Sequence, residues 1–257
     1  MSRPSFFLAC ACALAATGLA ACDDSPKPAG GAASASATTA PPAPKPTATV
    51  AKPKTMPELI VDSDGPYLGG QRVNMADASG PEKLTKIVKE LPIDGKPVTL
   101  QVEKKAKVSI AAAVVAALGD AGAPRVVIKT DGRNDLPTQL TVTPESRLTN
   151  VPGCSVVATV LKDLSTAVWS YKGTQAKKQR KGLAGPDLSH TGETLEKDLG
   201  ACDSTTAFFS GDDSVGWESV FNLAGTVSVS DKKKRLETFV LLAEEPVAGR
   251  AVTLRKH

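Results

Sequence analysis

From residue 59 onward, short apolar runs alternate with segments whose apolar residues recur at the period of a helix. The four apolar residues between Leu84 and Leu91 stand at i, i+3, i+4 and i+7, and this spacing predicts an amphipathic helix. The segment Ser79–Glu82 before them reads Ser-x-x-Glu, the capping-box pattern of a helix start. By contrast, the apolar run Val126–Ile128 predicts a short buried strand.

The first half of this region predicts the element order β-β-α-β-α-β-β. We expect strands at 59–61, 66–68, 97–102, 125–129 and 140–143, and helices over 84–91 and 110–118. The strand at 140–143 is expected at an edge of its sheet.

The second half repeats this order with little residue identity. We expect strands at 156–160, 167–171, 205–209, 239–242 and 251–254, and helices over 191–202 and 217–224. Thr99 corresponds to Thr206 and Val127 to Val240, about 110 residues apart. Alternating helices and strands favour mixed sheets with helices packed on a face. We therefore expect an α+β protein of two small units, over 58–146 and 150–257, each a mixed sheet with two helices on one face; two unrelated α+β domains are the alternative.

The first 57 residues have a different character. Residues 1–21 combine a positive start with an apolar core, as in a secretory signal peptide. Their end, Leu19-Ala20-Ala21-Cys22, resembles the lipobox of bacterial lipoproteins, which implies that Cys22 is diacylated and becomes the new N-terminus. An ordinary signal peptide cleaved at an A-x-A site is the alternative. The Ala- and Pro-rich residues 22–57 lack aromatic residues and predict a disordered linker between lipid and folded part.

Five cysteines are present, and three of them lie in the signal peptide or at its end. Cys154 and Cys202 remain after processing. In an oxidising compartment such an even pair predicts a disulfide, with two buried thiols as the alternative.

The first half resembles the periplasmic domain of ExbD and TolR, partner subunits of proton-driven transducers in Gram-negative envelopes. The resemblance rests on the hairpin 59–73, the helix 84–91, the strand 97–103 and the helix that runs into 122–127. It covers about residues 58–130; residues 154–257 are assigned to a second, diverged copy mainly by the repeat. The resemblance implies contacts with an envelope protein complex or the cell wall. The proton-conducting role does not transfer, because the apolar segment 6–21 lacks an acidic residue and would be removed.

The net charge of +4 is too small to argue for a nucleic-acid partner. Two basic runs stand between predicted elements, where solvated loops and contact with an anionic partner are both plausible roles. The candidate contact residues are Lys177, Lys178, Arg180, Lys181, Lys232, Lys233, Lys234 and Arg235.

No catalytic, cofactor-binding or metal-binding motif is found in the sequence. The two histidines are His190 and His257, and Ser189-His190 reads as the polar start of a helix. Asp212-Asp213 follows a strand and precedes a helix, so capping is favoured over a glycosidase-type carboxylate pair.

We therefore expect no enzyme and no cofactor, but a lipid-anchored cell-envelope protein that faces the periplasm and acts as a binding module. A cell-wall or substrate-binding lipoprotein independent of any transporter is the first alternative, and an envelope hydrolase is the second.

Overall fold

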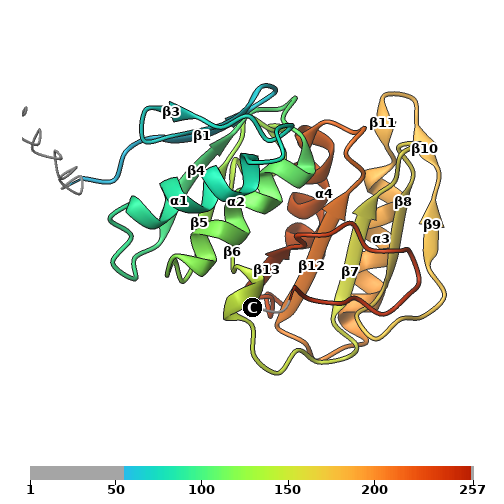
Figure 1. Ribbon diagram of the computed structural model, residues 1–257. Coiled ribbons are helices and arrows are strands. Elements are labelled where there is room, and N and C mark those ends of the chain that lie inside the picture. The colour runs from blue at the N-terminus through green and yellow to red at the C-terminus, as the bar shows by residue number, and fades with distance from the viewer. Residues whose placement is uncertain (1–54, 256–257) are drawn as a thin grey trace, which may run out of the picture. The chain divides into compact units, whose positions relative to one another are not determined.

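Both halves of the chain contribute strands to one mixed sheet of eleven strands (Figure 1). The computed structural model describes residues 55–255. The first half contains β1 (Leu59–Asp62), β2 (Gly65–Leu68), β3 (Gln71–Arg72), α1 (Gly80–Glu90), β4 (Val98–Val102), α2 (Val108–Asp120), β5 (Val126–Lys129) and β6 (Gln139–Val142). The expected α+β class with a mixed sheet is confirmed.

A 3-10 turn at Glu145–Arg147 leads into the second half. This half contains β7 (Val156–Val160), β8 (Thr166–Ser170), β9 (Lys177–Gln179), the short pair β10 (Lys181–Gly182) and β11 (Gly185–Pro186), α3 (Leu188–Gly200), β12 (Thr206–Gly211), α4 (Trp217–Ser230) and β13 (Thr238–Leu241).

Strand pairing follows the same scheme in the two halves. β1 pairs antiparallel with β2 and parallel with β4, and β7 pairs antiparallel with β8 and parallel with β12. The full order is β3-β2-β1-β4-β5-β6-β13-β12-β7-β8-β9. The second half therefore repeats the pairing of the first in reverse direction across the sheet.

Two separate sheets were expected, and this expectation is wrong. β6 lies between β5, to which it is antiparallel, and β13, to which it is parallel. The expected edge position of 140–143 is therefore also wrong. The physical reason is that β5 and β13 would each present unpaired backbone groups at an edge, and β6 satisfies both.

Most elements lie where the periodicity placed them, with three exceptions. Residues 251–254 form no strand, and β9, β10 and β11 occupy a segment expected to be a loop. Ser79 makes no side-chain capping hydrogen bond, so the capping box is not formed. Local pattern fails at these three places because tertiary contacts decide them.

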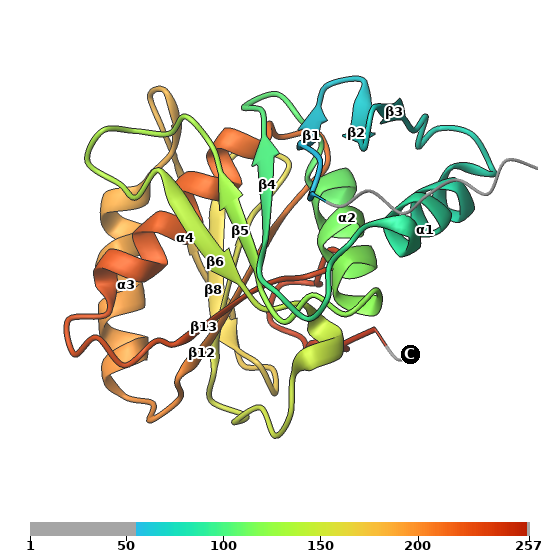
Figure 2. The same cartoon turned by 90° about the vertical axis from the view of Figure 1, so that its left-hand side faces the viewer.

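All four helices pack against the same face of the sheet, because their buried residues belong to one cluster with the strands. Figures 1 and 2 show how the sheet twists between α1 and α2, which lie against the strands of the first half, and α3 and α4, which lie against those of the second. Leu84 of α1, Leu118 of α2, Leu195 of α3 and Val220 of α4 belong to one continuous buried cluster with the inward side chains of the strands. Because this cluster crosses from one half to the other without a break, hydrophobic burial stabilises both halves together.

Polar contacts also join the two halves beneath the helices. We call this set of contacts, made by Trp217 and Asp213 of the second half, the seam. The Trp217 side chain is fully buried and its Nε1–H donates to Thr130 Oγ1 at 2.8 Å. The backbone N–H of Trp217 donates to the carbonyl of Ala106, again across the seam. Asp213 accepts from the backbone N–H and the hydroxyl of Ser109 at 2.8 and 2.6 Å. An acid of the second half thus caps a helix of the first half.

Candidate binding surface

The face of the sheet opposite the helices is open in the first half. In β4, Val98, Leu100 and Val102 are buried against the helices, whereas Thr99 is exposed and Gln101 half-buried. The same alternation occurs in β5 and β6. A strand with one buried and one solvated face shows this period-2 pattern.

In the second half the corresponding face is covered. β7 and β12 are buried at every residue. Their outward side chains form a second apolar cluster, under partly buried residues of the segments 148–151 and 248–254. Trp169 Nε1–H donates to the carbonyl of Arg250 at 2.8 Å, which fixes the C-terminal segment over the sheet. The two halves share strand order but differ in what covers this face.

The C-terminal segment is also held by a buried carboxylate. Glu145 is 8% exposed and accepts hydrogen bonds from the backbone N–H groups of Ala243 at 2.7 Å and Arg255 at 2.8 Å. Nothing in the local sequence signalled this role, because both donors lie about 100 residues further along the chain.

On the uncovered side of the first half, one row of side chains runs across neighbouring strands from the edge of the sheet toward its centre. Each member is the register partner of the next, in the order Arg72, Tyr67, Ile60, Gln101, Lys129 and Gln139. A second row contains Thr99, Val127 and Thr141. We call these nine residues the open face. It offers hydroxyl, amide and ammonium groups around a few apolar side chains.

At the edge of the open face the charges are neutralised within the protein. Arg72 forms an ion pair with Asp62 at 2.7 Å, and its guanidinium lies 5.8 Å from the centre of the Tyr67 ring. The hydrogen bond from Arg72 lowers the pKa of Asp62 below its usual value. Lys129 makes no ion pair within residues 55–255, so it is the cation of the open face that remains available.

A groove of about 700 Å³ borders the open face. Its walls are the segment Met56–Leu59, where the described chain begins, and the turn Pro92–Pro97. Its floor includes Thr99, Gln101 and Lys129 of the open face. Chemically, the groove is lined by the charged side chains of Glu58, Asp94 and Lys96 and by polar groups of the open face, together with apolar residues such as Ile93.

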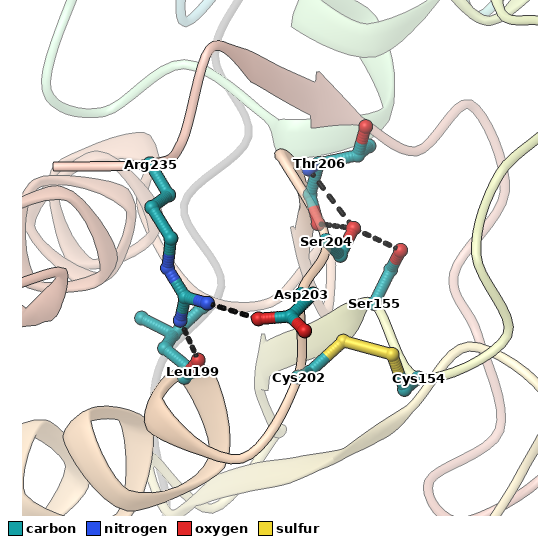
Figure 3. Close-up of a disulfide and its surroundings, with 8 residues drawn as sticks. All are labelled: Cys154, Ser155, Leu199, Cys202, Asp203, Ser204, Thr206 and Arg235. Carbon is teal, nitrogen blue, oxygen red and sulfur yellow. Dashed lines mark hydrogen bonds and ion pairs between the residues drawn. A yellow bond between two sulfur atoms is a disulfide. The ribbon is translucent and has the colours of Figure 1, made fainter. Parts of the chain in front are cut away.

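The two basic runs lie on either side of α3 and do not merge into one patch. Lys177 pairs with Asp198 of α3, and Lys232 lies 3.9 Å from Glu196 of the same helix. Arg235 donates to Asp203 at 2.7 Å (Figure 3). These three cations are therefore engaged within the protein.

The other members of the two runs are exposed: Lys178, Arg180, Lys181, Lys233 and Lys234. Two of them stand on short strands instead of in a loop, Lys178 on β9 and Lys181 on β10. β9 is the last strand of the sheet, and lysines on an edge strand oppose unwanted pairing with other chains. Contact with an anionic partner through these residues stays a prediction.

The expected disulfide between Cys154 and Cys202 is present, with Cα atoms 5.8 Å apart (Figure 3). It joins the chain just before β7 to the chain just after α3. Beside it, the buried hydroxyls of Ser155 and Ser204 lie 2.6 Å apart. The disulfide also borders a pocket of about 670 Å³ that contains the Lys177–Asp198 ion pair.

The polar start of α3 is confirmed. Asp187 accepts from the backbone N–H of His190 at 3.2 Å and lies 2.7 Å from His190 Nδ1. The hydrogen bond and the charge of Asp187 raise the pKa of His190, so the charged imidazole is favoured. Asp187 is thus the N-cap of this helix.

Comparison with models of known protein families, with curated protein sequences and with solved structures gave no match. Residues 55–255 contain no helix long and apolar enough to cross a bilayer. Within the same residues, no group of three acidic, histidine or cysteine side chains is arranged to hold a metal ion. The predicted lipidation site, Cys22, lies outside the described residues, as do residues 1–21 and most of the linker 22–57.

Proposed function

We propose that this protein is a lipid-anchored component of the cell envelope whose open face binds an extended segment of a partner protein. One observation carries the proposal. The outer face of the sheet is covered in the second half by the protein's own C-terminal segment, whereas the open face of the first half is uncovered. A face built on the same strand order but left polar and accessible is suited to a partner.

The chemistry of the open face favours a polypeptide partner. Thr99, Gln101 and Thr141 supply hydrogen-bond donors and acceptors on neighbouring strands, and Ile60 and Val127 add half-buried apolar contacts. The groove beside them, between Met56–Leu59 and Pro92–Pro97, would hold part of such an extended chain.

We further propose that each half is a diverged copy of an ExbD/TolR-like periplasmic unit. The pairing shared by the two halves supports a duplication, because β1 and β7 each lie between one antiparallel and one parallel neighbour. The partner would then belong to an envelope transport or energy-coupling complex. Since no match to a known family was found, the link to that family rests on the pattern of the sequence alone.

Replacing Cys22 with alanine should release the protein from the membrane. Without the thiol no diacylglycerol can be attached, and the remaining chain would move to the soluble periplasmic fraction. Fractionation of cells that express the wild type or the variant measures this directly. A variant that stays membrane-bound after a high-salt wash would contradict the lipoprotein interpretation.

Replacing Thr99 with glutamate should weaken capture of the partner from solubilised membranes by about tenfold or more. A carboxylate placed at the contact would be desolvated when the partner binds, and attraction to Lys129 on the neighbouring strand would offset only part of that cost. The matched control is Thr205→Glu, which introduces the same change at an exposed threonine of the second half. Equal capture by both variants would argue against the open face. Capture of cell-wall fragments in place of a protein would favour the transporter-independent alternative.

A further inference from the structure

A short hairpin follows β9 and projects from the main sheet. Its strands β10 and β11 form a two-stranded sheet of their own, with Gly182 opposite Gly185. Leu183 and Ala184 form the tip between them. The hairpin lies beyond the ends of β8 and β9, at the top right of Figure 1. We call residues 177–186, which comprise β9 and this projection, the basic hairpin; they belong to the second half and share no residue with the open face.

The tip of the basic hairpin presents a leucine that the fold does not use. The relative exposure of Leu183 is 111%, whereas Met56, Val229 and Val247, the other large apolar residues found exposed, reach 36, 48 and 61%. Leu183 belongs to neither apolar cluster of residues 55–255. Tight hairpin turns favour glycine, asparagine and aspartate, so the turn does not require a leucine either. Burial of this side chain by an apolar phase would be favourable.

The chain that leads to this tip is strongly basic. Residues 177–186 contain no acid and four cations, Lys177, Lys178, Arg180 and Lys181. Lys177 pairs with Asp198, and the other three make no ion pair with any residue of 55–255. The acids nearest to them are engaged elsewhere: Asp163 accepts hydrogen bonds from Ser165, and Asp187 pairs with His190. The basic hairpin therefore combines uncompensated positive charge with an exposed apolar tip.

We propose that the basic hairpin docks on a bilayer that contains anionic phospholipids, with Leu183 inserted at the boundary between head groups and acyl chains. Interfacial membrane contacts combine these two features, because cations attract the anionic head groups while apolar side chains leave water. An acidic protein surface would match the cations but would not require an apolar side chain at a projecting tip. The contact would hold the folded part against the membrane in one orientation, and it requires neither the open face nor the lipid at Cys22.

Vesicle flotation tests the docking. The whole mature chain is used with Cys22→Ala, so that no attached lipid contributes and the result does not depend on the lipoprotein interpretation. We expect the protein to float with vesicles of phosphatidylglycerol and phosphatidylcholine, and much less with phosphatidylcholine alone. High salt should release it, because screening weakens attraction between exposed charges. Failure to bind the anionic vesicles at low salt would overturn the proposal.

Insertion of the tip is measured by tryptophan fluorescence. The native indoles of Trp169 and Trp217 are buried, so Leu183→Trp introduces an exposed reporter. On anionic vesicles its emission should shift to the blue and be quenched by lipids with brominated acyl chains. The control Val247→Trp, at an exposed apolar residue of the C-terminal segment, should show neither change. Leu183→Ser should weaken vesicle binding about tenfold, because the apolar contribution is lost.

The contribution of charge is measured with two matched double variants. Arg180→Gln combined with Lys181→Gln should weaken binding about 25-fold, at about fivefold for each cation. Lys233→Gln combined with Lys234→Gln removes the same charge from the other basic run and should weaken binding less than about threefold. Equal losses in the two double variants would overturn the proposal, as would full binding by Leu183→Ser or unshifted emission of Leu183→Trp. Binding to polyglutamate as tight as to the vesicles would identify an acidic polypeptide as the partner and would also overturn it.

Discussion

Replacing Trp217 with alanine is expected to lower the free energy of unfolding by about 3–5 kcal/mol and to weaken both halves of the sheet together. The indole is fully buried at the seam, packs 6.1 Å from the ring of Phe221 and donates to Thr130 of the other half. Its removal leaves a cavity and takes one hydrogen bond from the buried Thr130 hydroxyl, which still donates to the carbonyl of Val102 at 3.0 Å. Urea denaturation followed by circular dichroism measures the change.

Hydrogen exchange then decides whether the two halves unfold as one. Amides of Leu100 and Ile128 report on the first half, and those of Ala158 and Phe209 on the second. Trp217→Phe keeps a ring but loses the hydrogen bond, so it should cost about 1–3 kcal/mol. If the first-half amides keep wild-type protection in Trp217→Ala, the seam does not couple the halves.

Removal of the disulfide is the second large effect. Replacing Cys154 and Cys202 with serine should lower the free energy of unfolding by about 4 kcal/mol in the chain-entropy account, given the sequence separation of 48. Since one sheet contains both halves, the loss should extend to the first half as well.

A reducing agent provides the control for this prediction. It should destabilise the wild type by a similar amount and leave the double-serine variant unchanged. Labelling of both cysteines by a thiol reagent in the unreduced mature protein would show that the bond does not form in the envelope. The pair would then act as two separate thiols.

Local structure could be predicted from the sequence to a large extent. The apolar run 156–160 gave β7 with both ends correct, and the spacing from Leu84 to Leu91 placed α1. Such elements depend on the period of apolar residues, which is a local property. Pairing between β6 and β13 depends on contacts between residues about 100 positions apart, and no local pattern encodes it.

The candidate site shows the same division. A sharper use of periodicity would have identified the open face, because 98–102 alternates apolar and polar residues whereas 156–160 is almost uniformly apolar. The role of Asp213 could not be found in this way. It was expected to cap the helix that follows it, but it caps α2, which begins 105 positions earlier in the chain (213 minus 108). The expectation of a capping role was therefore correct, but the helix that Asp213 caps was not the expected one.

Site-specific photo-cross-linking in living cells tests the binding function most directly. A photoreactive amino acid at Thr99 or Thr141 of the open face should give an adduct with the same envelope protein, because both positions would lie in the contact. The same amino acid at Thr205 should give none. Absence of an adduct at Thr99 and Thr141, or an identical set of adducts at Thr205, would contradict the account.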